Sequence, residues 1–442
     1  MAGKYQRYTE VKLSGIPWVL DELPSHWHVL PAFSVLKDEQ IKNAGGKETH
    51  VLSLSYGNIK TRDVERNAGL LPESFHTYQR VWPGDIILRL TDLQNDKRSL
   101  RVGRSSLKGI ITSAYLKLKA AKDLDDRYLY RLLHSYDTSK VFYGMGGGLR
   151  QSLKFEDFRR LPIIVPPVDE QEAIANFLDH ETAKIDALIE KQEKLIELLK
   201  EKRQAVISHA VTKGLNPDVP MKHSGIEWLG EVPEHWRIVK FSYVTTIQSG
   251  QVDPKESPYD QFDLIAPNHI ESGTGKLLAL ETAQAQGADS GKYLCPVGCV
   301  IYSKIRPALA KVTLSPHENV ICSADMYPII GSRNLYNIFL KWTLLSDWFT
   351  SLTILESDRV AMPKINREKL ADVKIVVPSL DEQMQIASYL DGVTTKLDVS
   401  IAKGQEQIQL LKERKSSLIS SAVTGKIDVR NWQSRSKEAD HA

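Results

Sequence analysis

The sequence contains few cysteines and offers no residue pattern that would hold a metal ion. Its three cysteines stand at positions 295, 299 and 322. A C-x-x-x-C spacing without a second pair suits zinc poorly, and buried thiols in a reducing compartment explain it better. The twelve histidines have no metal-ligand spacing, and we expect His134, on a predicted helix, to be structural. We therefore expect no metal site.

Catalytic motifs are also missing. No N-P-P-[YF] motif for adenine methylation is present, because NPDV at Asn216 and SPYD at Ser257 both depart from it. No Walker loop G-x-x-x-x-G-K-[ST] appears, and no paired carboxylates with a lysine suggest a nuclease. The glycines of GMGGGLRQ form no dinucleotide fingerprint, since Leu149 stands where the third glycine belongs. We expect no catalytic residues and no cofactor in this chain.

Long hydrophobic runs are absent as well. None approaches the roughly 18 residues that a membrane span requires. The first residues, MAGKYQRYTEVKLSG, lack the apolar region of a secretion signal. With 42% hydrophobic and 26% charged residues, the composition is that of a globular protein. These features predict a cytoplasmic protein that has no membrane partner.

The sequence does contain a long internal repeat. VPPVDEQEAIANFLD at residues 165–179 returns as VPSLDEQMQIASYLD at 377–391, without a gap and at an offset of 212 residues. A second pair, SGIPW with PSHW and SGIEW with PEHW, begins at Ser14 and Ser224. A chain of 442 residues is too long for one ordinary core. The repeat divides it into two similar halves, and we expect core positions for the repeated tryptophans Trp18, Trp27, Trp228 and Trp236.

Each half has the residue pattern of a mixed domain. The first half contains VLSLSYGNI, VWPGDIILRL and LKGIITSAYLKL, which predict short strands, and DDRYLYRLLHSY, which predicts a helix with an acidic first turn. The second half contains LIAPNHI, GCVIYSKI and MYPIIGS as strands and LYNIFLKWTLLSDWFTSL as a helix. Between residues 36–150 and 244–360 sequence identity almost disappears. Such divergence is expected if the two inserts bind different things.

The repeated segments predict two long amphipathic helices. From Asp169 onward, apolar residues keep spacings of three and four or multiples of these, and the copy does the same. A helix of about 30 residues spans ~45 Å, more than the ~34 Å of one DNA turn, so a helix pair can hold two domains apart on a duplex. We expect four leucines to pack helix on helix within the chain: Leu195, Leu199, Leu411 and Leu418.

The net charge of +3 hides an uneven distribution. Residues 1–165 carry 26 Lys and Arg against 18 Asp and Glu, whereas residues 169–213 carry 7 against 10. A basic globular part attached to an acidic helical part suits a polyanion-binding domain on a protein-binding spacer.

Together these motifs resemble those of a known family. P-x-x-[DE]-E-Q followed by I-A-x-[FY]-L-D and a long amphipathic helix occurs twice, each time after a variable domain that opens with P-x-H-W. From Ser14 to about Val429 this arrangement closely resembles the specificity subunit of type I restriction-modification systems. VWPGDIILRLTD and CPVGCVIYSKIRP also resemble the strand that recurs in the target-recognition domains of that family. The second departs from the usual Gly-Asp, because Cys299 follows Gly298.

The resemblance implies an α+β fold with a pseudo-twofold internal repeat. Two globular target-recognition domains would be separated by a pair of long antiparallel, coiled-coil-like helices. We place a first target-recognition domain at 1–165, a central conserved helix at 166–215, a second target-recognition domain at 216–376, a C-terminal conserved helix at 377–430 and a polar tail at 431–442.

The resemblance also implies a non-catalytic subunit that recognises double-stranded DNA. Each target-recognition domain would read one half of a bipartite asymmetric site, and the helices would set the number of unread bases between the halves. Two methyltransferase (M) subunits would bind the repeated helices and methylate adenine with S-adenosylmethionine. Restriction (R) subunits, which need ATP and Mg, would complete the nuclease. The rival hypothesis is a duplicated helical adaptor whose globular domains bind protein rather than DNA.

Basic segments beside predicted strands are our candidates for DNA contact. Arginine can meet phosphates or grip guanine, and an amide side chain can read adenine. The alternatives are a solvated basic loop and, after the glycines, a mobile connector. The candidates are Arg89, Gln94, Asn95, Lys97, Arg98, Arg101, Arg104, Lys108, Arg150 and Gln151 in the first half, and Lys304, Arg306, Lys311 and Arg359 in the second.

The acid-Glu-Gln triplets at the helix starts are our candidates for partner binding. The same triplet can be a plain cap, since carboxylates favour a helix N-terminus, and both roles can hold together. The residues are Asp169, Glu170 and Gln171 in the first copy and Asp381, Glu382 and Gln383 in the second.

Overall fold

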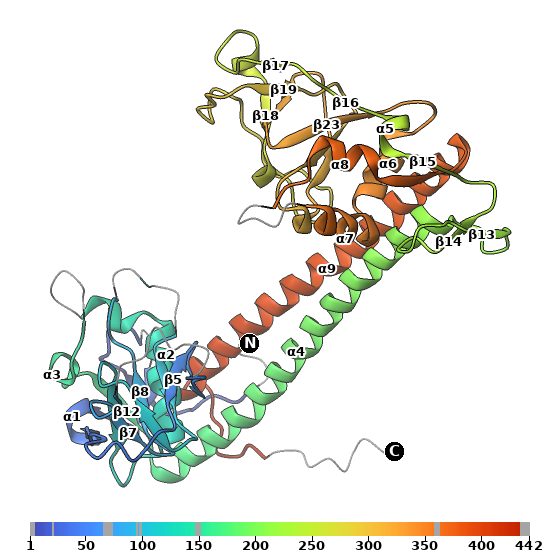
Figure 1. Cartoon of the computed structure of the whole chain (residues 1–442). Helices are drawn as coiled ribbons and strands as arrows, with labels where there is room; N and C mark the ends of the chain where they lie inside the picture. Colours follow the sequence, from blue (N-terminus) through green and yellow to red (C-terminus); the bar gives the residue numbers. More distant parts are fainter. Residues whose placement is uncertain are drawn as a thin grey trace. The chain divides into compact units, whose positions relative to one another are not determined.

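The chain forms two compact units. The computed structural model describes residues 5–19, 22–64, 74–93, 96, 100–145, 152–357 and 363–433 (Figure 1). Unit 1 comprises Met1–Gln192 and Glu406–Ala442, and unit 2 comprises Glu193–Gln405. Both unit boundaries fall inside a long helix. Each unit therefore contains the start of one long helix and the end of the other.

Unit 1 surrounds the start of the first long helix with short strands and one longer helix. The predicted helix after Asp125 is confirmed, because the Asp125 carboxylate accepts hydrogen bonds from the N–H groups of Arg127 and Tyr128 and caps it. The elements in chain order are β1 (Val11–Leu13), β2 (Glu22–Pro24), β3 (His28–Pro31), α1 (Ala32–Val35), β4 (Leu36–Asp38), β5 (Leu52–Ser55), β6 (Asn58–Thr61), β7 (Gln79–Val81), β8 (Ile86–Leu88), β9 (Val102–Arg104), β10 (Gly109–Ile111), β11 (Leu116–Ala120), α2 (Asp126–Thr138), the 3-10 helix η2 (Val141–Gly144), α3 (Phe155–Phe158), β12 (Pro162–Val165) and α4 (Val168–Lys213).

Unit 2 follows the same order. Its elements are β13 (Met221–His223), β14 (Glu231–Pro233), β15 (Arg237–Lys240), α5 (Phe241–Val244), β16 (Thr245–Ile247), β17 (Gln251–Val252), η3 (Tyr259–Gln261), β18 (Asp263–Ile265), η4 (Pro267–His269), β19 (Lys292–Leu294), β20 (Val300–Ser303), η5 (Pro307–Leu309), β21 (Val312–Leu314), β22 (Val320–Cys322), β23 (Met326–Gly331), α6 (Asn337–Leu344), α7 (Asp347–Glu356), α8 (Arg367–Asp372), β24 (Lys374–Val377) and α9 (Leu380–Val423). The prediction of one helix over LYNIFLKWTLLSDWFTSL was wrong. Two helices form because Ser346 adopts an extended backbone and its hydroxyl donates to the carbonyl of Thr343.

The two units share one sheet topology. A four-stranded antiparallel sheet has the order β4-β11-β8-β9 in unit 1 and β16-β23-β20-β21 in unit 2. The pairs β1-β2 and β3-β12 return as β13-β14 and β15-β24. Among the described strands, the inserted ones differ: unit 1 has a β5-β6 hairpin and a β7-β10 pair, whereas unit 2 has a sheet of order β17-β19-β22-β18. The predicted α+β class and internal repeat are confirmed, and the segments without sequence identity contain the different strands.

The repeated tryptophans divide into core and surface. Trp27 and Trp236 are buried, as predicted, whereas Trp228 is 48% exposed, so its predicted core position was wrong. In unit 1 the half-buried Trp18 packs edge-on against the ring of Tyr136 at 5.6 Å. No ring contact of this kind involves Trp228 within the described residues. All three cysteines are free and buried, as the sequence predicted.

The long helices run side by side in each unit (Figure 1). Because the start of one helix pairs with the end of the other, the two run antiparallel. One of the four predicted packing positions was wrong: Leu195 is 46% exposed, and its neighbour Ile196 is buried instead. Leu195 therefore does not pack helix on helix, whereas Leu418 is buried and Leu199 is half-buried. No helix among the described residues is long and apolar enough to cross a membrane.

Candidate nucleic-acid interface and its supporting frame

The glutamates of the two triplets connect each long helix to its P-x-H-W segment. Glu170 accepts hydrogen bonds from Trp27 Nε1 at 2.9 Å and from the Tyr8 hydroxyl at 2.7 Å, and it pairs with His26 Nε2 at 2.6 Å. Glu382 contacts His235 Nε2 at 2.9 Å and Trp236 Nε1 at 3.2 Å. In each unit, the histidine and tryptophan of the P-x-H-W motif thus contact the glutamate of the acid-Glu-Gln triplet.

The hydrogen bonds of the two glutamates are accompanied by pKa shifts of different groups in the two units. Burial acts to raise the pKa of Glu382, but hydrogen bonds from His235, Ser379 and Trp236 outweigh it and hold that pKa below its ordinary value. In unit 1 the shifted group is Tyr8, which donates a hydrogen bond to Glu170. Burial, followed by this hydrogen bond, raises the pKa of Tyr8 far above the ordinary value. Tyr8 therefore stays protonated and donates its hydrogen.

The glutamines of the triplets are buried and cap helices of the globular parts. Gln171 Oε1 accepts from the Asp125 N–H at 2.8 Å, and Gln383 Oε1 accepts from the Tyr336 N–H at 2.7 Å. Asp125 and Tyr336 are the N-cap residues of α2 and α6. Each glutamine also donates to a proline carbonyl just before its own helix. The triplets thus position α2 and α6 on the long helices.

The aspartates of the triplets have a different environment. Asp169 and Asp381 are exposed in the first turns of α4 and α9. Glu170, Gln171 and Gln383 are buried and Glu382 is half-buried, all bonded within the chain. Of the six partner-binding candidates, the two aspartates present the most surface to another protein.

One cross-helix ion pair is also duplicated. In unit 2, Arg203 Nε on α4 lies 2.8 Å from Asp398 Oδ1 on α9. In unit 1, Lys415 on α9 lies 2.7 Å from Asp186 on α4. The repeat offset of 212 residues relates arginine to lysine and aspartate to aspartate. Sequence reasoning missed this pair, although base and acid at matching positions of both copies was a signal that could have found it.

Among the unit 1 candidates for DNA contact, burial separates supporting from accessible residues. Arg101 is fully buried, and its guanidinium donates to the carbonyls of Arg89, Thr91 and Asp92 at 3.0, 2.8 and 3.2 Å. It shapes the loop from within. Arg104 pairs with Asp126, Arg89 is half-buried, and Lys108 is exposed.

The unit 2 candidates divide in the same way. Lys311 Nζ donates to the carbonyls of Pro267 and Ile270 at 2.6 and 2.8 Å, which ties η4 to β21. Lys304 is half-buried with its ammonium 5.6 Å from the ring centre of Tyr327. Arg306 is exposed in the left-handed conformation, at φ 48°. Tyr302, within β20, is buried.

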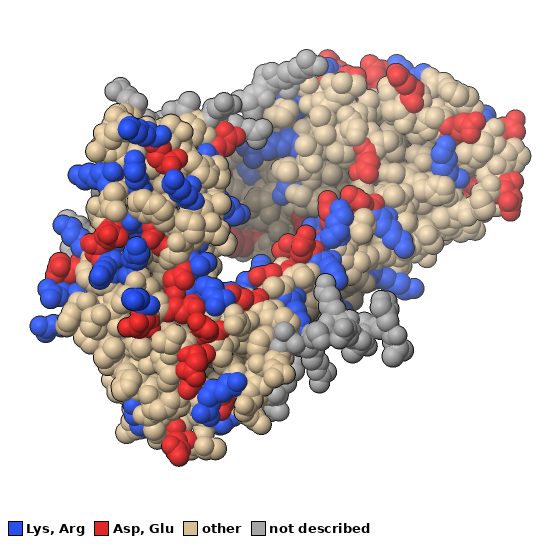
Figure 2. All heavy atoms as spheres, turned by 90° about the horizontal axis from the view of Figure 1, so that it is seen from below, with Lys and Arg blue, Asp and Glu red and all other residues tan. Residues whose placement is uncertain are grey.

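The remaining candidates lie outside the described residues: Gln94, Asn95, Lys97, Arg98, Arg150, Gln151 and Arg359. Figure 2 shows Lys and Arg side chains over unit 1, at the left of the view, with Asp and Glu among them. On this face the basic excess is mixed with acidic groups and does not form a patch of one sign.

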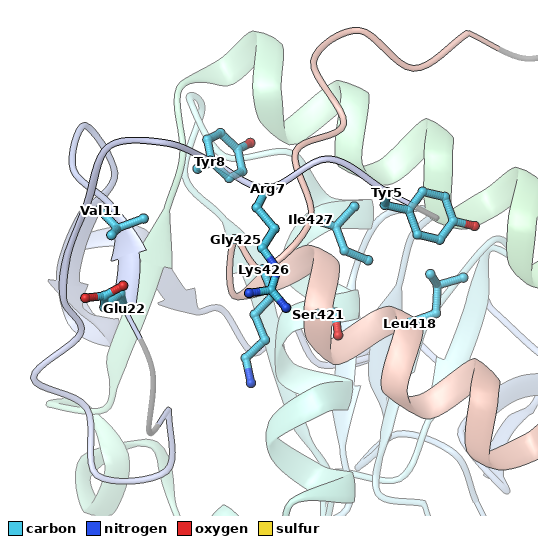
Figure 3. A pocket seen from close by; sticks show the side chains of 10 residues that line it. All are labelled: Tyr5, Arg7, Tyr8, Val11, Glu22, Leu418, Ser421, Gly425, Lys426 and Ile427. Carbon is cyan, nitrogen blue, oxygen red and sulfur yellow. The ribbon is translucent and has the colours of Figure 1, made fainter. Parts of the chain in front are cut away.

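A cavity of about 460 Å³ lies in unit 1 where the segment that follows Tyr5 meets the segment that follows α9 (Figure 3). The Asp428 N–H donates to the Gln6 carbonyl there, and Arg7 and Lys426 contribute to the lining beside apolar side chains. In unit 2 the chain continues at the comparable place from the end of α4, through Gly214, to β13. The described residues contain no group of three or more His, Cys, Asp and Glu side chains that could hold a metal ion.

Known proteins share both the sequence pattern and this fold. The family described as "Type I restriction modification DNA specificity domain" matches residues 110–198 and 233–410. The EcoDI specificity subunit of Escherichia coli is 27% identical over 326 residues, which cover 70% of this chain and 72% of that protein. The MjaVIII specificity subunit of Methanocaldococcus jannaschii is 28% identical over 344 residues, 73% of this chain and 76% of that protein.

Solved structures agree at the level of the fold. A chain from a study of complex assembly and conformational transition of the type I R-M system superposes with a TM-score of 0.64 at 16% identity, covering 92% of this chain and all of that one. The HsdS subunit of Thermoanaerobacter tengcongensis gives a TM-score of 0.50 at 16% identity, covering 92% and 99%. Since the family match extends over more than half of the chain, this protein belongs to the family of type I restriction-modification specificity subunits.

Proposed function

We propose that the chain recognises a bipartite, asymmetric target in double-stranded DNA, with unit 1 reading one half and unit 2 the other. The observation that carries the proposal is the division inside each unit. The frame repeats its central contacts, since Glu170 and Glu382 each bind the histidine and tryptophan of a P-x-H-W segment, whereas the strands inserted after β4 and β16 differ. A repeated frame with different inserts suits two readers of different base sequences.

The accessible basic residues are the DNA contacts that we carry forward. They are Arg89 and Lys108 in unit 1 and Lys304 and Arg306 in unit 2. The candidates outside the described residues we keep on the sequence pattern alone. Arg101 and Lys311 we assign to support, because main-chain carbonyls hold their cationic groups. Arg104 is intermediate, since its ion pair with Asp126 would have to exchange for a phosphate.

Two methyltransferase subunits bind the outer faces of the long helices. These faces carry exposed apolar side chains that the chain itself leaves uncovered, Leu188, Leu195 and Leu198 on α4 and Met384, Tyr389, Val399 and Leu410 on α9. The exposed Asp169 and Asp381 lie in the first turns of the same helices. As a specificity subunit the chain is non-catalytic: the partners bring S-adenosylmethionine for adenine methylation, and restriction subunits bring ATP and Mg, in the cytoplasm.

Salt dependence separates this proposal from an adaptor that binds protein. Several phosphate contacts make duplex affinity fall steeply between 50 mM and 200 mM salt, by roughly 10³-fold or more for six contacts. An adaptor shows weak, sequence-blind binding or none.

Sequencing of methylated adenine in the source genome, before and after deletion of this gene, tests the target itself. Loss of methylation at one two-part motif supports the proposal and supplies both half-sites and their spacing. An unchanged methylation map in a strain that expresses the complex contradicts it.

A further inference from the structure

We propose that the β5-β6 hairpin of unit 1 enters a groove of the target DNA and that Tyr56, at its tip, packs its ring against base edges of the half-site. The inference rests on the proposed function, because it needs unit 1 to read DNA. It adds a specificity-determining residue and the element that delivers it.

The hairpin tip has an unusual residue in a demanding backbone position. Ser55 pairs with Asn58, so Tyr56 and Gly57 form a two-residue turn in which both have positive φ, 47° and 78°. Asn-Gly is the usual choice for this turn, since a large side chain at positive φ costs conformational energy. Strain of this kind is concentrated at functional sites.

Of the two turn residues, Tyr56 is exposed and Gly57 is buried. Tyr56 is 77% exposed, whereas its neighbour Gly57 is buried against the hairpin's support. A Cβ at Gly57 would lie 3.2 Å from Leu100 Cβ and 3.4 Å from the Val102 carbonyl. The Asn58 side chain donates to the Tyr56 carbonyl at 3.2 Å. Gly57 and Asn58 thus fix the turn, while the ring of Tyr56 is exposed to solvent.

The two faces of the hairpin have opposite character. Leu54 and Ile59 face inward, in one cluster with Val81, Ile87 and Ile111. On the other face of β6, Asn58 and Lys60 are exposed and Arg62 follows two residues later. A two-stranded ribbon fits the major groove of B-DNA, where basic side chains meet phosphates and apolar groups meet base edges such as the thymine methyl.

The support of the tip connects it to the basic segment singled out in the sequence. Leu100 and Val102, which lie against Gly57, flank Arg101 in the chain, and Arg104 follows two residues after Val102. The Arg89 N–H donates to the Arg101 carbonyl next to them. The hairpin tip is therefore supported by the segment of unit 1 that contains Arg101 and Arg104, and Tyr56 lies 77% exposed above this support.

Three variants in the complex with its methyltransferase subunits test the inference. The probes are a duplex with the motif found by methylation sequencing and a duplex of equal length without it. Tyr56→Asn keeps the turn, relieves its strain and removes the ring, so we expect affinity for the target to fall about tenfold and affinity for the other duplex to stay within about twofold. Tyr56→Phe keeps the ring and should bind both duplexes like the native complex.

Controls separate folding and partner effects from DNA reading. The unfolding midpoint of Tyr56→Asn should equal or exceed that of the native chain, and its assembly with the methyltransferase should be unchanged. Phe33→Ala removes another exposed aromatic of unit 1, 50% exposed, and should leave both affinities unchanged.

The inference is overturned if Tyr56→Asn binds the target like the native complex, weakens both duplexes equally or fails to assemble with its partners. It is overturned equally if Tyr56→Phe is as weak as Tyr56→Asn, since the hydroxyl and not ring packing would then act. A native complex that does not distinguish the two duplexes contradicts the proposed function itself, whatever the variants do.

Discussion

Unit 1 and unit 2 share the glutamate contacts and the cross-helix ion pair, but the side chains that make them differ in solvent exposure. The Glu170 side chain is 6% exposed in unit 1, whereas its counterpart Glu382 is 32% exposed in unit 2. For the cross-helix ion pair the difference in burial is reversed. The Arg203 side chain of unit 2 is 6% exposed, whereas the Lys415 side chain of unit 1 is 29% exposed. Neither unit is simply the tighter copy. The comparison teaches that a duplicated frame tolerates changes in burial as long as each polar group keeps a partner.

A second contrast concerns the outer face at the start of each long helix. Phe177 of α4 is buried under the rings of Tyr5 and Trp432, at 5.3 and 5.4 Å. Its counterpart Tyr389 on α9 is 46% exposed, and a Cβ at the nearby Gly392 would meet nothing within 4 Å. Tyr5 and Trp432 thus cover in unit 1 a residue whose counterpart in unit 2 is exposed, so the two partner positions we propose are not identical.

The largest difference between the units should come from the glycine after each long helix. Gly425 and Gly214 both have positive φ, 71° and 79°. A methyl group at Gly425 would also collide with the ring of Pro24, whereas at Gly214 it would lie 3.2 Å from Trp236. We expect Gly425→Ala to destabilise unit 1 by about 4 kcal/mol and Gly214→Ala to destabilise unit 2 by about 1 to 2 kcal/mol. Hydrogen exchange, measured separately on peptides from each unit, checks the order; equal losses would contradict it.

The motif glutamates should show the next largest difference. Glu170→Ala leaves three donors, Tyr8, Trp27 and His26, without their acceptor in a buried site. We expect a loss of about 3 kcal/mol in unit 1, against about 1 kcal/mol for Glu382→Ala, where water can replace the carboxylate. Denaturant titration followed by tryptophan fluorescence measures both. A larger loss in unit 2 would mean that burial does not govern the contact.

Acid should weaken unit 1 through a residue on α2. Burial, followed by the nearby Arg131 and Lys415, lowers the pKa of His134 from 6.5 to about 4. The unfolded chain therefore binds a proton that the folded chain refuses, and stability falls as pH drops from 6.5 toward 4. The loss by pH 5 is about 2 kcal/mol. His134→Phe should remove this part of the pH dependence, and an unchanged profile of the variant would show that other groups cause it.

The frame could be predicted from the sequence because it is present twice. The repeat located both long helices, and the acidic cap located α2. The partners of Glu170 were harder to predict, since His26 and Trp27 lie 144 and 143 residues away in the chain. Their own repetition beside a repeated glutamate was the available signal.

Accessibility of the candidate site could not be predicted in the same way. Arg101 stands in a run of basic residues that has the composition of a DNA contact, yet it is buried, and its guanidinium donates to the main-chain carbonyls of Arg89 and Thr91. Tyr56 was predicted only as part of a strand, and its exposure depends on a two-residue turn and on Gly57 packing against Leu100. These outcomes depend on contacts between inserted segments, for which the chain offers no second copy to compare.

Exchange of residues 36–150 for those of another subunit of this family tests the central claim most directly, with methylated adenine mapped in cells that carry the exchanged chain. The account predicts that one half of the methylated motif changes, while the other half and the spacing stay the same. A change in both halves, or a motif that does not change in cells that still methylate, would contradict two independent readers on a repeated frame.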